Sequence, residues 1–539
     1  MLGVATGEPV RRVDAVVVGA GFAGLYALHR LRGLGLSAQG FDTAADVGGT
    51  WWWNRYPGAR CDIESMDYSY SFSPDLEQEW EWSERYATQP EILRYASHVA
   101  DRFDLRRDIR FETRVASAEW DDVEQRWTIG TDRGDAVSAR FCILAVGCLS
   151  AAKDPEIPGI ESFGGPAYHT GRWPHEGVDF TGQRVGVIGT GSSGIQAIPL
   201  LAEQAAHLTV FQRTPNFALP AHNAPLDPAA KAATKARYRD HRAEQRASQG
   251  GVVFTRSDRP VSAAGPEERE AAFWKAWDSG HLFGLLGSFN DILVDPAANE
   301  AAAEFVRERI REIVADPELA ERLSPRSYPF GTKRACLDTG YYATFNRDDV
   351  TLVDLGTCPI EEITPGGVRT AAGEIALDAI VFATGFDAMT GAFLGPEIVG
   401  CVGRTLAEKW WAGPRSYLGI AVAGFPNLFT ITGPGSPSVL TNMLVSIEQH
   451  VDWTVDAIAH LVANGLTSID AAVDAEDAWV EHVNELAGYT LFPSAASWYM
   501  GANVPGKPRV FMPYLGGVAG YREICDEVAA DGYRGFHLR

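Results

Sequence analysis

The chain has 539 residues, 46% of them hydrophobic, which is enough apolar material for two or three domains. Its formal net charge of −23 argues against a nucleic acid or an anionic membrane as partner, because both select basic surfaces. Seven cysteines without a C-x-x-C pair or metal-ligand spacing argue against a disulfide framework and a metal site. We therefore expect a cytoplasmic protein, in which an anionic ligand needs a local basic pocket.

The N-terminal dozen, MLGVATGEPVRR, contains no apolar run of the kind found in a signal peptide. No apolar stretch approaches the roughly 20 residues needed to span a bilayer. These two features predict a soluble protein.

Residues 13–35 predict a strand, a glycine turn and a helix with leucines at helical spacing. Gly19, Gly21 and Gly24 form the G-x-G-x-x-G pattern that lets a pyrophosphate approach a helix N-terminus. Asp42 ends the next predicted strand, where its carboxylate can accept hydrogen bonds from the ribose hydroxyls of an adenosine. The segment predicts a dinucleotide-binding fold; the alternative is a glycine-rich turn without a ligand.

Residues 48–62 read GGTWWWNRYPGARCD, a glycine pair followed by large aromatic side chains. Such a segment can lie along the flat ring system of a cofactor. The glycine pattern alone fits either FAD or NAD, and this neighbouring segment favours FAD for the first site.

A stretch rich in glycine and aromatic residues, FGGPAYHTGRWP, occupies residues 163–174. It lies between the predicted strand 141–147, which returns to the first dinucleotide fold, and a new strand that begins at residue 184. This position predicts a linker between two domains. His169 is then expected to act as a hinge or to position a cofactor rather than to serve as a catalytic base.

A second strand, glycine turn and helix is predicted over residues 184–204. Its next strand ends in Gln212 and Arg213, so the ribose-binding acid of the first copy is replaced by an amide and a permanent cation. This exchange favours a 2′-phosphate, as in NADPH, although Arg213 as a plain surface residue is the alternative. The predicted contacts of this cofactor are Thr190, Gly191, Ser192, Ser193, Gly194, Gln196, Arg213 and Thr214, with Gly189 opening the turn.

Residues 220–325 are rich in Ala, Glu and Arg and predict a mostly helical insertion. Residues 378–387 predict another returning strand. The C-terminal part predicts a helix over 446–461 and a Gly-Pro-aromatic loop over 494–517, and loops of that length often line a ligand site.

The predicted fold class is therefore α/β, with two Rossmann-like dinucleotide-binding domains, one inserted in the other, and a mostly helical insertion. The expected FAD-binding domain comprises residues 1–147 plus 388–539. The expected NADPH-binding domain comprises 148–219 plus 326–387, and the insertion covers 220–325.

The stretch 163–174 resembles the fingerprint F-x-G-x-x-x-H-x-x-x-W-P of the Baeyer-Villiger monooxygenases, flavoenzymes that convert ketones to esters or lactones with NADPH and O2. It matches every fixed position: Phe163, Gly165, His169, Trp173 and Pro174. The resemblance extends from the first strand to the C-terminus and is nearest to the phenylacetone-oxidising members, with the steroid-oxidising members near. The segment ACLDTGYY after residue 334 departs from this pattern and looks more like the steroid and cyclohexanone enzymes.

The resemblance implies FAD and NADPH as cofactors and a reaction through a C4a-peroxyflavin and a tetrahedral adduct. It assigns Arg334 to stabilising the peroxyanion and the oxyanion of the adduct, and Asp62 to pairing with this arginine near the flavin. It assigns Lys333 to the 2′-phosphate, and Trp498, together with Arg334, to the nicotinamide side of NADP. Without the motifs around them, Arg334 and Asp62 would be interpreted as an ordinary salt bridge. Trp498 would be interpreted as a residue of the hydrophobic core.

Further positions follow from the resemblance. The expected FAD contacts are Thr50, Trp51, Asp62, Tyr68 and Met443. Ser438, Val439 and Leu440 are candidate substrate-pocket residues, and an apolar lining suits an aryl, cyclic or other hydrophobic ketone.

Three rival functions were weighed. A flavin-containing N- or S-oxygenating monooxygenase is the enzymatic alternative; such enzymes share the start of the fingerprint but usually lack its Trp-Pro end. A disulfide reductase needs a redox cysteine pair, and Cys61 has no nearby partner. A flavin-dependent sensor predicts no ketone-stimulated use of NADPH. The expected partners are a small ketone and O2, and the oligomeric state stays open, a monomer included.

Overall fold

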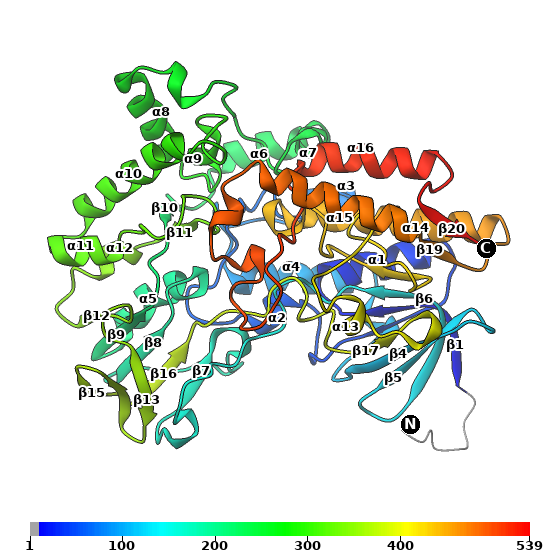
Figure 1. Cartoon of the computed structure of the whole chain (residues 1–539), viewed down its shortest axis with the longest axis horizontal. Coiled ribbons are helices and arrows are strands. Elements are labelled where there is room, and N and C mark those ends of the chain that lie inside the picture. The colour runs from blue at the N-terminus through cyan, green and yellow to red at the C-terminus, as the bar shows by residue number, and fades with distance from the viewer. Residues whose placement is uncertain (1–9) are drawn as a thin grey trace.

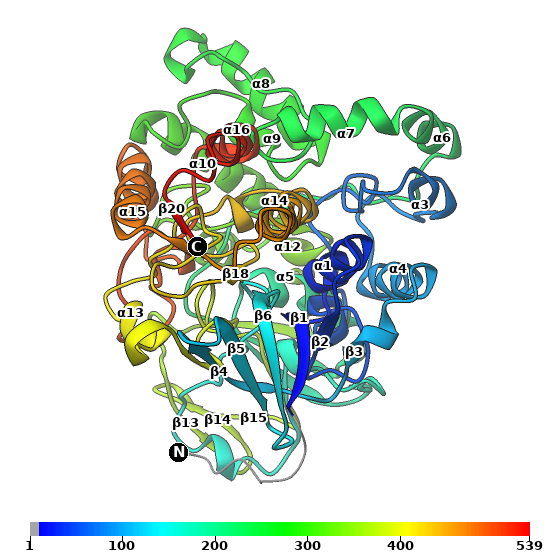
Figure 2. The same cartoon turned by 90° about the vertical axis from the view of Figure 1, so that its right-hand side faces the viewer.

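The computed structural model describes residues 10–539, and its two main sheets lie beside each other with helices packed around them (Figures 1 and 2). The expectation that the N-terminal dozen is no signal peptide falls mainly on residues 1–9, which lie outside the described residues. Within residues 10–539, no helix has the length and apolar character required to cross a membrane.

The first sheet has eight strands and runs in the order β17-β4-β5-β6-β1-β2-β3, with β18 also paired to β6. Its strands are β1 (Arg11–Val18), β2 (Ala38–Phe41), β3 (Ile109–Arg110), β4 (Val115–Asp121), β5 (Arg126–Thr131), β6 (Ala136–Leu144), β17 (Glu397–Val399) and β18 (Leu428–Thr430). The strands β3, β2, β1, β6 and β18 pair in parallel, whereas β4, β5 and β6 form an antiparallel meander. Burial of parallel strands on both faces explains why β1 ends in the apolar run of residues 15–18.

The strand β6 divides its outer edge between two partners. Its first half pairs with β5, through residues such as Ala139, and its last three residues pair with β18, Leu144 opposite Thr430. A strand from the C-terminal third of the chain therefore completes the sheet that the N-terminal residues begin.

The second sheet has five parallel strands in the order β12-β9-β8-β16-β7. They are β7 (Ala167–His169), β8 (Arg184–Ile188), β9 (His207–Gln212), β12 (Val350–Asp354) and β16 (Ala379–Phe382). The stretch 163–174 is thus more than the predicted linker, because its central residues form the edge strand β7 and pair with β16. A three-residue strand flanked by glycine and proline gives no sequence periodicity to detect.

Helices cover the sheets and separate the hydrophobic cores. Against the first sheet pack α1 (Phe22–Gly33) and α14 (Met443–Ala463), which contact each other and share one core. Helix α5 (Ser192–Gln204) packs on the second sheet and shares a core with the helical part of residues 220–325. That part contains α6 (Pro228–Ala236), α7 (Tyr238–Ala247), α8 (Pro266–Ser279), α9 (Gly284–Gly287), α10 (Pro296–Ile313) and α11 (Pro317–Leu323).

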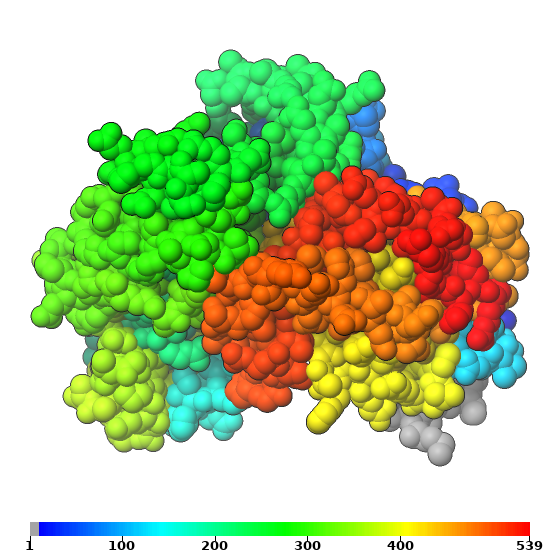
Figure 3. Space-filling model, turned by 45° about the horizontal axis from the view of Figure 1, so that its top comes forward, coloured from blue at the N-terminus to red at the C-terminus, as the bar shows by residue number. Residues whose placement is uncertain are grey.

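The C-terminal segment covers the junction between these parts. Helix α16 (Gly517–Ala530) contacts α7, and Figure 3 shows the orange and red C-terminal residues packed against the green helical part.

The remaining helices are α2 (Thr50–Trp53), α3 (Pro74–Glu79), α4 (Gln89–Arg102), α12 (Tyr341–Thr344), α13 (Leu406–Lys409) and α15 (Val473–Gly488). The remaining strands are β10 (Ala218–Pro220) with β11 (Cys336–Asp338), β13 (Ile360–Thr364), β14 (Gly367–Thr370) and β15 (Gly373–Ala376), and β19 (Ile469–Ala471) with β20 (Phe536–Leu538).

Candidate active site

The first glycine turn joins β1 to α1 and is held by close backbone packing. Gly19 has φ +109°, and a Cβ on Gly24 would lie 1.8 Å from the Gly19 carbonyl oxygen, so only glycine fits there. The Asp42 carboxylate accepts hydrogen bonds from the backbone N–H of Ala20 (2.6 Å) and Ala44 (2.7 Å). Burial raises the pKa of Asp42, an effect that these backbone hydrogen bonds oppose. The acid predicted to bind ribose is therefore fixed beside the turn.

The segment 48–62 folds directly against this turn. A Cβ on Gly21 would lie 3.3 Å from the Cα of Gly49, and α2 begins at the exposed Thr50. The indole N–H of Trp51 donates to the Tyr68 hydroxyl at 3.2 Å, which brings two predicted FAD contacts together. Met443, the first residue of α14, is partly buried against the same core as Trp51 and Tyr68.

The second glycine turn joins β8 to α5 and repeats the geometry of the first. Gly189 has φ +113°, and a Cβ on Gly194 would lie 2.3 Å from the Gly189 carbonyl oxygen. A Cβ on Gly191, by contrast, would meet no atom within 4 Å. The hydroxyl of Thr190 donates to the backbone oxygen of Thr214 at 3.0 Å and ties the turn to the end of β9. The open space over Gly191 at a helix N-terminus fits a pyrophosphate.

The two glycines of this turn have separable roles, which predicts different outcomes for two alanine variants. Gly194→Ala places its methyl group on a backbone oxygen, and we expect a clear fall in the thermal unfolding temperature. Gly191→Ala adds its methyl group to open space at φ −81°, so we expect unchanged stability but weaker NADP(H) binding. Thermal denaturation and cofactor titration of both variants measure the difference. Equal loss of binding and stability in both variants would contradict this division.

Ser192 and Ser193 begin α5; Ser192 is exposed and its hydroxyl lies 3.1 Å from the Cys336 sulfur, whereas Ser193 is half-buried. Gln196 lies on α5, as predicted, and its side chain hydrogen-bonds to two residues of the segment 48–62. Its amide oxygen accepts from the Tyr56 hydroxyl at 2.8 Å, and its Nε2 donates to the Arg60 carbonyl at 3.2 Å. The Gln196 side chain therefore links α5 to the segment 48–62, and its contact with NADP stays a prediction.

Gly58 allows the segment 48–62 to approach the backbone of α5 closely. It has φ +83°, and a Cβ there would lie 2.1 Å from the backbone oxygen of Gln196. Tyr56 and Gly58 were not among the predicted site residues, although the Tyr-Pro-Gly run inside GGTWWWNRYPGARCD carried the signal. Their contacts fix the first dinucleotide fold against the helix of the second.

Two cations gather near the end of β9. Arg213 is exposed one residue beyond this strand, and the Lys333 ammonium lies 4.5 Å from the centroid of the Tyr328 ring. Burial lowers the pKa of Lys333, and the nearby charge of Arg213 lowers it further. Among residues 10–539, neither cation has a carboxylate oxygen within ion-pair distance. Gln212 is buried instead, its amide donating to the Arg322 carbonyl at 2.8 Å. The two charges form a local basic pocket in an acidic protein.

Arg334 and Asp62 form a bidentate ion pair across 272 residues of sequence. The Nε–H donates to Asp62 Oδ2 at 2.6 Å and Nη2 donates to Oδ1 at 2.8 Å. Nη1 donates to the Val439 carbonyl at 2.7 Å. Both side chains are largely buried, 18% and 25% exposed. The pair lies where β11, the segment 48–62 and the start of α14 meet.

The environment keeps Arg334 charged. Burial lowers its pKa, but the Asp62 charge and hydrogen bonds outweigh burial and hold the pKa above its ordinary value. Tyr499, which the sequence analysis did not select, is fully buried beside Arg334; burial raises its pKa to about 12, while Arg334 lowers it. The partly buried ring of Trp498 packs against the Tyr499 ring, tilted by 43°, with centroids 4.1 Å apart. Asn503 of the same loop donates to the Phe386 carbonyl at 2.6 Å, and Lys507 pairs with Asp387 at 2.5 Å.

The three candidate pocket residues form one 3-10 turn before α14. Ser438 is completely buried, and its hydroxyl donates to the Thr432 carbonyl at 3.3 Å. Val439 is also buried, whereas Leu440 is partly buried. The backbone of Val439 touches Arg334, so this turn borders the ion pair even where its side chains point into the core.

His169 and Trp173 of the fingerprint 163–174 make contacts with other groups of the protein. Nδ1 of His169 accepts from the Gly171 N–H at 3.0 Å, and its Nε2 lies 3.2 Å from the Thr384 hydroxyl. Burial lowers the pKa of His169. Trp173 is 4% exposed and packs against the rings of Tyr168 and Phe180. Both histidine nitrogens are engaged, which fits positioning rather than base catalysis.

All seven cysteines lie within the described residues, and none forms a disulfide. Cys61 is buried beside Asp62, and burial raises its pKa. Residues 10–539 contain no group of three or more His, Cys, Asp or Glu arranged to hold a metal ion. The site therefore offers two dinucleotide turns, a basic pocket and a buried arginine–aspartate pair.

Known proteins are similar to this chain over nearly its whole length. The family model described as pyridine nucleotide-disulphide oxidoreductase matches residues 16–247. A Baeyer-Villiger monooxygenase of Pseudooceanicola batsensis is 45% identical, over 96% of this chain and 95% of the relative. The acetone monooxygenase (methyl acetate-forming) of Gordonia sp. is 44% identical over 98% and 99% of the two chains. The phenazine N-monooxygenase PhzNO1 of Lysobacter antibioticus is 43% identical over 97% of each chain.

Solved structures agree in fold as well as in sequence. Oxidized steroid monooxygenase bound to NADP is 55% identical and superimposes with a TM-score of 0.94, over 98% of this chain and 99% of that one. The OTEMO complex with FAD and NADP is 39% identical with a TM-score of 0.95, over 98% and 100% of the two chains. The predicted α/β class with two dinucleotide folds is confirmed, as is the similarity to steroid-oxidising enzymes.

Proposed function

The chain belongs to the Baeyer-Villiger monooxygenase family, and on this premise we propose that it converts hydrophobic ketones to esters or lactones with NADPH and O2. It is an FAD- and NADP-dependent oxidoreductase. The Arg334–Asp62 pair carries the proposal, because it offers a charged donor at the junction of the two dinucleotide folds.

The hydrogen bonds of Arg334 leave part of its guanidinium free. The group has five N–H bonds, and three of them donate to Asp62 and Val439, so two remain. One of them lies on Nη1 and the other on Nη2, the two terminal nitrogens of the guanidinium fork, and the Tyr499 hydroxyl lies within hydrogen-bonding reach of this side chain. Such a fork, fixed in advance by its partners, is suited to stabilising an oxyanion that develops on a ketone oxygen. Asp62 holds the fork in place and keeps it charged.

Both cofactors fit the residues that the structure brings together. We assign FAD to the first glycine turn, with Asp42 toward its ribose and Thr50, Trp51, Tyr68 and Met443 as further contacts. We assign NADPH to the second turn, with Arg213 and Lys333 toward its 2′-phosphate and Thr214, Trp498 and Arg334 as further contacts. When bound, FAD supplies the activation of O2, and NADPH supplies the reducing equivalents. Because Arg334 is largely buried, its charge interacts more strongly with a nearby anion than it would in water.

A domain division follows from the two sheets. We propose residues 1–147 plus 388–539 for the FAD domain, supported by the pairing of β17 and β18 with the N-terminal strands. Residues 148–219 plus 326–387 form the proposed NADPH domain, supported by β12 and β16 in the second sheet. We also propose a cytoplasmic location, supported by an odd number of cysteines without disulfide spacing.

A ketone panel tests the function. The FAD-loaded enzyme is incubated aerobically with NADPH and aryl, cyclic or steroid ketones, and products are followed by mass spectrometry. We expect the rate of NADPH consumption to rise when ketone is added, and the products to be heavier than the ketone by one oxygen atom. When the reaction is run under ¹⁸O2, this added atom should be ¹⁸O. A reaction without NADPH is the control. NADPH consumption that no ketone stimulates, with no oxygen inserted, would refute the proposed function.

N-oxygenation is a second candidate, favoured by the 43% identity with a phenazine N-monooxygenase. Adding a phenazine to the panel separates the two functions. Oxygenation of the phenazine nitrogen without ester or lactone from any ketone would favour this candidate.

A further inference from the structure

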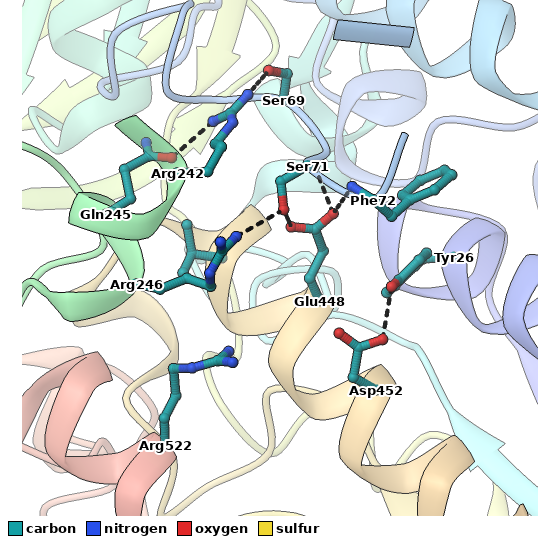
Figure 4. A pocket seen from close by; sticks show the side chains of 11 residues that line it. Tyr26, Ser69, Ser71, Phe72, Arg242, Gln245, Arg246, Glu448, Asp452 and Arg522 are labelled. Atoms are coloured by element: carbon teal, nitrogen blue, oxygen red, sulfur yellow. Dashed lines mark hydrogen bonds between the residues drawn. The ribbon is translucent and has the colours of Figure 1, made fainter. Parts of the chain in front are cut away.

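A cavity of about 230 Å³ lies where α1, α7, α14 and α16 come together, on residues that none of the sites above uses (Figure 4). Its wall also includes the chain segment that contains Ser71 and Phe72. This volume accommodates a small organic molecule of several heavy atoms.

Three guanidinium groups face two carboxylates in this cavity: those of Arg242, Arg246 and Arg522, and those of Glu448 and Asp452. Three positive charges against two negative ones leave a net charge of +1. A single negative charge on a ligand would therefore balance the lining.

The two carboxylates are already satisfied by protein groups. Glu448 accepts from the Ser71 N–H at 2.7 Å and the Ser71 hydroxyl at 2.6 Å, and also from the Phe72 N–H at 3.1 Å. Asp452 accepts from the Tyr26 hydroxyl at 2.7 Å and pairs with Arg30. Burial raises the pKa of both carboxyl groups, and the hydrogen bonds from Ser71 and Tyr26 oppose this rise.

Arg242 is likewise engaged, through Glu77 at 2.8 Å and the Ser69 hydroxyl at 2.5 Å. Arg246 and Arg522 differ from it, since within the part of the chain that the structure describes neither has a carboxylate oxygen at ion-pair distance. Arg246 has one long hydrogen bond, 3.5 Å to the Ser71 hydroxyl. Figure 4 shows the Arg522 guanidinium reaching from α16 toward the centre of the cavity, with Arg246 above it on α7.

We propose that this cavity binds a small monocarboxylate between Arg246 and Arg522. A guanidinium fork matches a carboxylate with two parallel hydrogen bonds, and the net charge of +1 favours a monoanion over a dianion such as hydrogen phosphate. The rings of Tyr26 and Phe72, stacked 4.9 Å apart, and the side chain of Val445 give a short apolar tail a wall to pack against. The bound anion would connect α7 to α16 beside α14.

Calorimetric titration of the FAD-loaded enzyme tests the proposal. NADP⁺ is kept in excess so that the basic pocket of Arg213 and Lys333 is occupied, and sodium propionate, sodium benzoate and inorganic phosphate are titrated separately. We expect saturable binding of a carboxylate, weakened at least about tenfold by Arg246→Gln and by Arg522→Gln, because each loses a charge-assisted pair. Arg239→Gln is the matched control: Arg239 is exposed on the same helix as Arg246 but does not line the cavity.

Three results would overturn the proposal: no saturable carboxylate binding, equal affinity in all four proteins, or tighter binding of phosphate than of either carboxylate. A crystal structure of the unmodified enzyme with NADP⁺ and propionate decides the matter if the variants fail to fold. Electron density for propionate between the two guanidinium groups supports the site, and its absence at saturating propionate overturns it. This outcome is independent of which substrate the enzyme oxygenates.

Discussion

Replacing Arg334 with alanine is expected to lower ester or lactone formation by about 100- to 1,000-fold, the usual effect of removing an oxyanion donor. The expected cause is loss of the two free N–H groups that the bonds to Asp62 and Val439 leave on this side chain. NADPH consumption should persist, because the second glycine turn and the cations Arg213 and Lys333 still bind the cofactor when its contact with Arg334 is lost. The measurement is product by mass spectrometry against NADPH absorbance, with the same ketone.

Two further variants separate charge from geometry. Arg334→Lys keeps a cation but not the planar fork, so its product formation is expected to fall between that of alanine and arginine. Arg326→Ala is the control for loss of a nearby arginine, since Arg326 pairs with Glu321 on the surface at 2.5 Å. Ester formation at the parent rate by Arg334→Ala would show that the fork has no catalytic role. Thermal denaturation of each variant excludes unfolding as the cause.

Removing either cation of the basic pocket, by Arg213→Ala or Lys333→Ala, is expected to raise the KM for NADPH roughly 10- to 100-fold. This range corresponds to the about 1.5–3 kcal/mol of a hydrogen bond to a charged group. NADH lacks the 2′-phosphate, so its KM should change little. The ratio of kcat/KM for NADPH and NADH, measured at constant ionic strength, reports the change in preference.

A control outside the basic pocket accompanies these variants. Arg369→Ala removes an exposed arginine that pairs with Glu374 at 3.1 Å, and it should leave the cofactor ratio unchanged. Equal losses with NADPH and NADH in Arg213→Ala would mean that this arginine does not read the 2′-phosphate. The double variant tests whether Arg213 and Lys333 share one ligand group, because neighbouring residues on one group give non-additive losses.

Local patterns in the sequence predicted both glycine turns, because their physical requirements are local. Gly24 and Gly194 each pack against a glycine five residues earlier, and the strand, turn and helix around them carry clear periodicities. The change from Asp42 to Gln212 and Arg213 could be read at matching strand ends. The resemblance to a family added Arg334 and Asp62, which no local pattern connects.

Several features depended on packing between distant segments. The edge strand β7 is too short for a periodic pattern and exists through its pairing with β16. Gln196 occupies the expected helix, but Tyr56 and Arg60 take its amide. Ser438 lies in the expected loop, yet its side chain is buried against Thr432. In each case the partner comes from a part of the chain that the local sequence does not specify.

The α/β class, the two dinucleotide turns and the difference between their ribose-binding ends could be predicted without the structure. These features depend on strand and helix periodicity and on backbone space at glycine, which neighbouring residues fix. The tertiary structure decided which donors of Arg334 remain free and which arginines of the cavity between α7 and α16 lack a carboxylate. Hydrogen bonds and ion pairs are short-ranged and directional, so only the folded chain decides which groups are satisfied and which stay available to a ligand.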